Sequence, residues 1–153
     1  MDDFTIARVI HVAAVLLWIG GVAFVTSVLM PALMRETPPN ERLSVFHRFE
    51  GRFAAQARIW VGLAGLSGFW MIWRANLWDR FLDPRFWWMH AMLIVWLGFS
   101  LMLYVVEPFF LHHKMQDAVS LDLFPRMLTM HRIALAVSLI TLFGAVAGSH
   151  GLM

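Results

Sequence analysis

Cysteine is absent from the 153 residues, and charged side chains make up only 14% of them. The absence of cysteine excludes disulfides, thiolate ligands and cysteine-held iron–sulfur clusters, so histidine and methionine are the soft metal ligands that remain. Soluble globular domains contain about 25% charged residues, whereas this chain is 60% apolar. The composition therefore predicts an integral membrane protein in one domain, residues 1–153.

A cleavable signal peptide is also missing from the pattern. The N-terminus, MDDF, is acidic, and the apolar run that follows is too long for a signal-peptide core. The basic residues are spread through loops and helix ends, so a bilayer explains the pI near 9.9 better than nucleic acid does. We expect a lipid bilayer as the main partner and no nucleic acid.

Four apolar segments predict helices at about 6–34, 43–73, 86–111 and 127–149. The first segment includes the stretch from His11 to Leu33, in which His11 is the one ionisable side chain. This stretch is long enough to span a membrane, because roughly 20 apolar residues cross a hydrocarbon core of about 30 Å. The charged front of the second helix is expected to project into the headgroups or cytoplasm, and Pro108 to bend the third. Because backbone groups in lipid must bond internally, we predict an all-α, up-down-up-down four-helix bundle.

The distribution of basic residues predicts the orientation. Eight lie on the side of the first and third connections and four on the side of the termini, so both termini are predicted to be periplasmic in a bacterial inner membrane. The eight are Arg35, Arg42, Arg48, Arg52, Arg58, Lys114, Arg126 and Arg132, and the four are Arg8, Arg74, Arg80 and Arg85.

Two histidines match in depth near the outer side. His11 lies three residues past Arg8 and His90 lies five past Arg85, a mismatch of about 3 Å along a helix. The first and third helices are diagonal in the simplest ring order, so the two imidazoles are candidates for the axial ligands of a haem iron. An ordinary hydrogen-bonded role is the alternative for either histidine.

Small residues on the other two helices would give a porphyrin room at this depth. Arginines at the outer boundary are candidates for the haem propionates, because guanidinium matches carboxylate geometry. The alternative for the glycines is close helix packing without any cofactor. The small residues are Gly62, Gly65, Gly68, Gly144, Ala145, Ala147 and Gly148, and the arginines are Arg8, Arg74 and Arg85.

The inner side has a second cluster, of histidine and methionine, which favours Cu(I). Its members are Met30, Met34, His112, His113, Met115, Met127, Met130 and His131. Methionine as a flexible gap-filler is the alternative. His131 with His47 is a further option for a second haem, although His47 is expected on a wet helix face. His150 is expected to be solvated or to gate the cofactor, and Glu107 is expected to form an ion pair at a helix end rather than a proton path.

The segment FTIARVIHVAAVLLWIGGVAF resembles the opening of the small four-helix membrane proteins related to the copper-resistance protein D domain and to HemJ-type protoporphyrinogen oxidases. FEGRFAAQAR, FWWMHAMLIVWLGF and LFPRMLTMHRIAL follow in the order and spacing of the remaining landmarks, so the likeness covers nearly the whole chain. The resemblance implies an inner-membrane bundle with b-type haem or copper handling, and it carries the first-helix histidine over to His11.

Two departures from that group bear on activity. The HemJ-type lysine of the third helix is missing, since the chain reads His90-Ala91-Met92 there. The Asn-Glu-Pro element after the fourth-helix arginine is replaced by Met127-Leu128-Thr129. Histidine in the place of lysine favours bis-histidine haem over porphyrinogen oxidation.

The hypothesis from the sequence is a haem b protein of cytochrome b type, a possible haem-dependent oxidoreductase. It would pass single electrons between a quinone or other small-molecule partner and an acceptor near the outer face, because a six-coordinate iron favours electron transfer. The alternative is a copper-binding or copper-transport protein that uses His112, His113, Met115 and His131. A third option is a structural membrane subunit that binds nothing.

Overall fold

The computed structural model describes residues 2–111 and 123–151, with side chains over 2–107 and 123–151. Within these ranges the chain is helical and contains no strand. The elements in order are α1 (Asp3–Phe24), η1 (Val25–Leu29), α2 (Met30–Glu36), α3 (Arg42–Arg74), η2 (Trp78–Leu82), η3 (Pro84–Phe86), α4 (Trp87–Leu101), η4 (Met102–Leu111) and α6 (Leu123–Ser149). The four predicted helices are therefore present.

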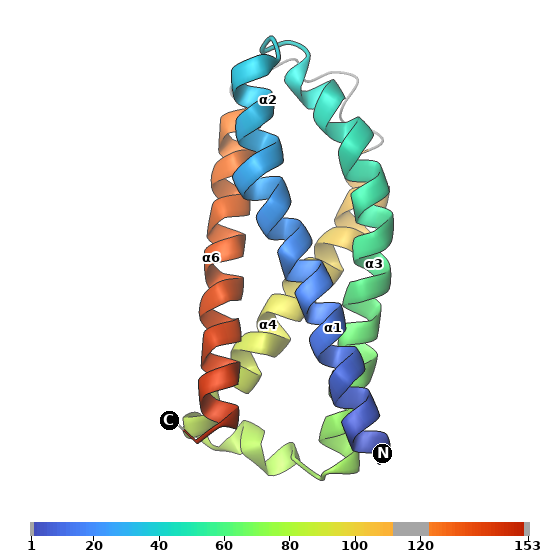
Figure 1. Cartoon of the computed structure of the whole chain (residues 1–153), viewed down its shortest axis with the longest axis vertical. Coiled ribbons are helices and arrows are strands. Elements are labelled where there is room, and N and C mark those ends of the chain that lie inside the picture. Colours follow the sequence, from blue (N-terminus) through green and yellow to red (C-terminus); the bar gives the residue numbers. More distant parts are fainter. Residues whose placement is uncertain (1, 112–122, 152–153) are drawn as a thin grey trace.

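The helices pack as long rods, with both ends of the chain at one end of the molecule and α2 at the other (Figure 1). The most extensive interface joins α1 to α3, the next joins α4 to α6, and smaller ones join α1 to α6 and α3 to α4. This leaves α1 and α4 as diagonal neighbours. They meet through Trp18 and Phe99, whose ring centroids lie 4.9 Å apart.

Local sequence signals set the helix ends. The Asp2 carboxylate accepts a hydrogen bond from the Thr5 backbone N–H at 2.7 Å and caps α1. Asp83 caps η3 in the same way through the Arg85 N–H. The fourth helix begins at Leu123, four residues before the predicted start, because Pro125 is tolerated in a first turn whose N–H groups have no helical partner.

Two prolines coincide with π-helical turns. The ring of a helical proline clashes with the carbonyl four residues before it, and a wider turn relieves that clash. For Pro31 that carbonyl belongs to Ser27, inside η1, and for Pro108 it belongs to Tyr104, inside η4. The expected disturbance at Pro108 is thus a π-helix that extends over Met102–Leu111.

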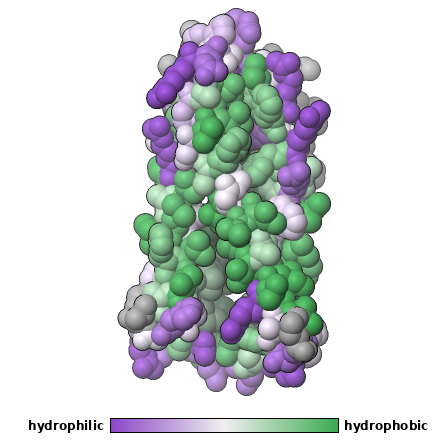
Figure 2. Space-filling view, in the orientation of Figure 1, coloured by the Kyte–Doolittle hydropathy of each residue, from purple (hydrophilic) through white to green (hydrophobic). Residues whose placement is uncertain are grey.

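Three helical stretches of the described residues are long and apolar enough to cross a membrane: Asp3–Glu36, Pro84–Glu107 and Leu123–Ser149. The second predicted span does not reach this standard. Only 15 residues, Ile59–Trp73, separate Arg58 from Arg74, which is about 22 Å of helix, and glycine and tryptophan dilute its hydropathy. Figure 2 shows an apolar girdle between polar ends, with polar side chains extending down the edge formed by the first half of α3.

Candidate functional sites

His11 lies against the α3 backbone. Its Nδ1 is 2.8 Å from the Ala64 carbonyl oxygen and 3.3 Å from Ser67 Oγ. A carbonyl oxygen can only accept, so Nδ1 carries the proton and donates it. In the neutral ring Nε2 is then the nitrogen with a free lone pair, as in metal-bound histidines anchored through their other nitrogen.

His90 is oriented in the opposite sense. Its Nε2 lies 2.9 Å from the Phe81 carbonyl oxygen, and its ring makes an edge contact with the Phe81 ring at 5.4 Å. By the same reasoning Nε2 is the protonated nitrogen, and it is directed at η2. The described contacts therefore bring His11 to α3 and His90 to η2, and none of them joins the two imidazoles.

Aromatic rings fill the space beside the predicted glycines. A Cβ at Gly65 would lie 2.5 Å from Trp96, and at Gly68 it would lie 3.1 Å from His11 itself. On α6 a Cβ at Gly144 would meet Trp87, and one at Gly148 would meet Trp88, each at 2.5 Å. A Cβ at Gly62 would lie 3.2 Å from the Tyr104 hydroxyl. Each of these glycines thus leaves a notch in the surface of its helix, and the notch allows a side chain of a neighbouring helix to pack closely.

Each arginine predicted to bind propionates has a neighbour within the chain. Arg74 pairs with Asp3 at 2.9 Å, Arg85 pairs with Asp83 at 2.6 Å, and Arg8 lies over the Phe4 ring at 5.0 Å. The hydrogen bonds from Arg85 hold the pKa of the Asp83 carboxyl below its ordinary value.

Together these contacts decide how well a haem fits the outer residues. His11 leaves Nε2 free, as an axial ligand would. His90 instead uses its Nε2 to donate to the Phe81 carbonyl, and aromatic rings occupy the space beside the glycines that was predicted for a porphyrin. The described arrangement therefore does not fit a haem between His11 and His90. The prediction rested on the depth of the two histidines, and depth does not say which way each ring faces.

The end of the bundle opposite the termini, which is predicted to be the inner end, contains a second group of histidines around Phe46. His47 Nδ1 pairs with Glu50 at 2.9 Å, while His47 Nε2 is buried and has no hydrogen-bond partner among the described residues. The expectation of a wet helix face holds only in part, since the His47–Glu50 pair is partly exposed whereas His47 Nε2 is buried. The His-x-x-Glu spacing at His47 and Glu50 is the signal that sequence reasoning overlooked.

His131 approaches the same ring from α6. The Phe46 side chain is fully buried and makes edge contacts with His47 at 5.8 Å and with His131 at 6.2 Å. His131 Nδ1 donates to the Met127 carbonyl at 2.9 Å, so its Nε2 is also the nitrogen left for another partner.

Thioethers belong to the same inner core. Met30 is fully buried with Phe46, and Met34 and Met127 pack against them. His112, His113 and Met115 lie outside the described residues. Among the residues that are described, no group of three or more histidine, aspartate and glutamate side chains is placed to hold a metal ion.

The ion pair expected near the third helix end is present. Arg58 lies 3.1 Å from Glu107 and also donates through Nε to the Leu103 carbonyl at 3.0 Å. These contacts join the middle of α3 to η4, so the pair has a role in helix packing.

No protein-family model matches this chain, and no curated protein or solved structure shows significant similarity to it.

Proposed function

We propose that the chain is an integral membrane protein whose four helices cross the bilayer alternately, with both termini on the periplasmic side of a bacterial inner membrane. The three apolar stretches and the excess of basic residues at the inner end support this proposal. Helix α3 completes the bundle despite its short apolar part. Arg58 and Arg74 flank that part, and long basic side chains extend to the interface from such positions.

We further propose that the inner group, which we call the His–Met cluster and define as His47, His131, Met30, Met34 and Met127, binds Cu(I). The observation that carries this proposal is the buried, unpartnered Nε2 of His47, held in place by the Glu50 carboxylate. A buried polar atom without a partner is costly, so it requires an explanation such as a bound ion. Carboxylate-anchored histidine is the usual form of a metal-binding imidazole.

The type of donor atom favours copper in the cuprous state. Thioether and imidazole ligands select Cu(I), whereas carboxylate and carbonyl oxygens suit harder cations. Cysteine is absent, and the methionine sulfurs lie in the same buried core as Phe46, which touches both imidazoles. The apolar surroundings also exclude water, which disfavours the doubly charged Cu(II).

Competition with a colorimetric Cu(I) chelator tests this function on the detergent-purified chain. His47→Ala and His131→Ala are expected to weaken Cu(I) binding strongly, and Glu50→Gln by about 10- to 100-fold through loss of the anchoring carboxylate. His150→Ala is the matched control, because His150 is exposed just after α6 and donates to the Val146 carbonyl of that helix. Equal Cu(I) affinity in all four variants would rule the His–Met cluster out.

The second candidate is the haem b protein of one-electron transfer, and one observation favours it. The donation from His11 Nδ1 to Ala64 leaves Nε2 oriented as a ligand nitrogen. An absorption spectrum of the same preparation, before and after dithionite, distinguishes the two. A Soret band that disappears in His11→Ala would support haem, and a colourless protein that binds Cu(I) would exclude it.

A further inference from the structure

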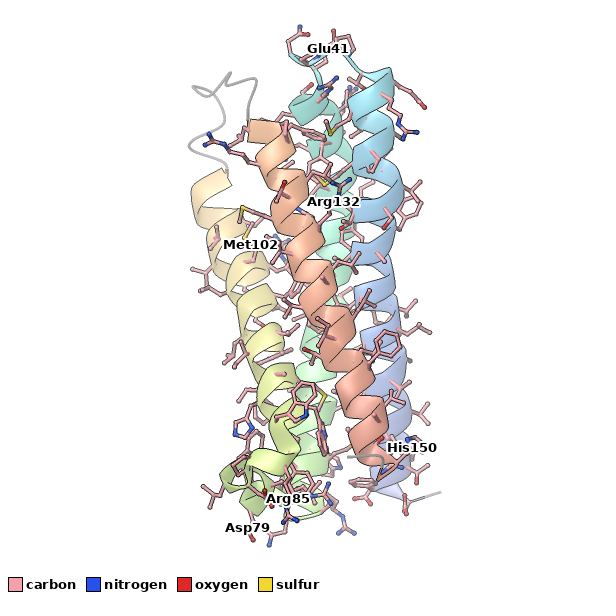
Figure 3. All side chains as sticks on the ribbon, turned by 90° about the vertical axis from the view of Figure 1, so that its left-hand side faces the viewer. Glu41, Asp79, Arg85, Met102, Arg132 and His150 are labelled. Carbon is pink, nitrogen blue, oxygen red and sulfur yellow. The ribbon has the colours of Figure 1, made fainter. Side chains whose placement is uncertain are left out.

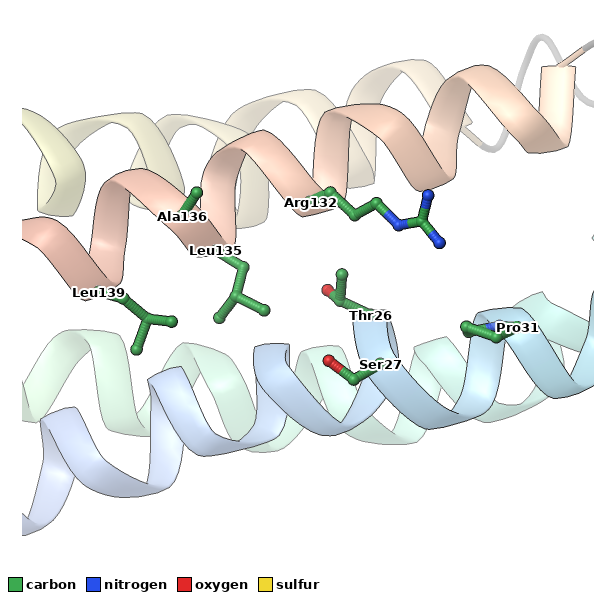
Figure 4. Close-up of a pocket in the computed structure, with 7 residues that line it drawn as sticks. All are labelled: Thr26, Ser27, Pro31, Arg132, Leu135, Ala136 and Leu139. Atoms are coloured by element: carbon green, nitrogen blue, oxygen red, sulfur yellow. The ribbon is translucent and has the colours of Figure 1, made fainter.

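A groove opens between the first and last helices near the inner end, with a volume of about 400 Å³. Its lining is polar at one end and apolar at the other: Thr26, Ser27, Pro31, Arg132, Leu135, Ala136 and Leu139 (Figure 4). It lies where η1 interrupts the α-helical path before Pro31. π-Helical turns are rare and occur frequently at functional sites.

Thr26, like Ser100, differs from most hydroxyl residues of the described helices. Ser67, Thr129 and Ser138 each donate to a carbonyl of the preceding turn, which is how hydroxyls are satisfied in helices. Thr26 is 2% exposed, and its Oγ1 is buried with no hydrogen-bond partner in the part of the chain described. Its side chain extends from η1 towards α6 (Figure 4). Thr26 thus brings a hydroxyl without a partner to the wall of the groove.

Arg132 supplies the charge. None of the described residues forms a hydrogen bond or ion pair with its guanidinium, which extends along the groove towards Pro31 (Figure 4). Figure 3 places Arg132 between the level of Glu41 at one end of the molecule and that of His150 at the other, and the residue is exposed. From Arg132 the helix continues for 17 residues without a charge, Ile133–Ser149, or about 25 Å. If the bundle spans a membrane as proposed, Arg132 lies at the level of the inner phosphate groups.

We propose that this groove binds an anionic phospholipid, with the phosphate held by the Arg132 guanidinium and the Thr26 and Ser27 hydroxyls. An acyl chain would then follow the apolar lining formed by Leu135, Ala136 and Leu139. Guanidinium matches phosphate geometry, and hydrogen bonds to a charged group are stronger than neutral ones. The excess of arginine at the inner end favours an anionic headgroup over a zwitterionic one.

Native mass spectrometry of the full chain, released from bilayers that contain phosphatidylglycerol and phosphatidylethanolamine, tests the proposal. Retained phosphatidylglycerol is expected to fall about tenfold in Arg132→Gln. A smaller decrease is expected in Thr26→Val, which removes the hydroxyl but keeps the shape. Arg126→Gln is the matched control, because Arg126 is an exposed arginine on the same helix and the change in net charge is identical.

The outcomes separate this proposal from the one on which it rests. Protein recovered outside the membrane would contradict the membrane topology itself. Inserted protein that loses phosphatidylglycerol equally in Arg132→Gln and Arg126→Gln, or that retains phosphatidylethanolamine as well as phosphatidylglycerol, would overturn the lipid site alone. Retention of a free fatty acid in place of phospholipid would show that a carboxylate, and not a phosphate, is the group recognised.

Discussion

Replacing Gly65 with alanine tests whether the indole of Trp96 occupies the notch on α3. The new Cβ would lie 2.5 Å from the Trp96 ring. That ring is held in place because its Nε1 donates to the Val61 carbonyl at 2.9 Å and it forms a T-shaped pair with Phe69, with centroids 5.6 Å apart. Overpacking costs about 1–3 kcal/mol, and loss of the hydrogen bond adds about 1 kcal/mol. Alanine regains roughly 0.5–1 kcal/mol of helix propensity. We expect a net destabilisation of about 1–3 kcal/mol.

The free energy of unfolding in mixed mild and denaturing detergent measures this effect, and Gly98→Ala is the control. A Cβ at Gly98 meets nothing within 4 Å, so that variant is expected to be unchanged or slightly more stable. Adding Trp96→Phe to Gly65→Ala should recover part of the loss, because the smaller ring vacates the clashing position. If Gly65→Ala is as stable as Gly98→Ala, Trp96 does not fill the notch and the packing of α3 against α4 is different.

Other perturbations have equally definite outcomes. His11→Ala removes a hydrogen bond between helices, so the free energy of unfolding in detergent should fall by about 1–2 kcal/mol; an unchanged value would contradict the contact. Arg85→Gln should return the pKa of Asp83 towards its ordinary value near 3.8 in an NMR titration. Because the folded pKa is lowered, the small stabilisation from this exposed pair is present above that value and is lost as the pH falls through the lowered pKa. Arg58→Ala should lower the free energy of unfolding in detergent, because it removes both the ion pair with Glu107 and the hydrogen bond to the Leu103 carbonyl of η4; an unchanged value would contradict these contacts.

Much of the fold could be predicted from the sequence because few charges interrupt long apolar runs. The four helices follow from rules that act over a few residues. The π-helical turns before Pro31 and around Pro108 did not follow, since a proline predicts a disturbance but not how the backbone accommodates it. The limited apolar length of α3 was visible in the spacing of Arg58 and Arg74, but it was outweighed by the four-helix pattern.

The candidate sites were harder to predict, because a sequence fixes how deep a residue lies more firmly than which neighbour it faces. Each residue advances a helix by 1.5 Å and turns it by about 100°, so an error of one residue hardly changes depth but turns a side chain to another helix. His11 and His90 illustrate this, since one donates to α3 and the other to η2.

The positions of glycines help to predict which neighbour a helix face meets, but only together with the aromatic rings that pack against those glycines. Gly144 and Gly148 lie four residues apart and therefore on one face of α6. Trp87 and Trp88 are adjacent at the start of α4, and each meets one of these glycines. These two contacts fix both the register and the rotation of α4 against α6, because the glycines lie one turn apart and the indoles belong to successive residues. Spacing of small residues thus predicts a contact between two helices, whereas the same glycines interpreted alone predicted room for a flat cofactor.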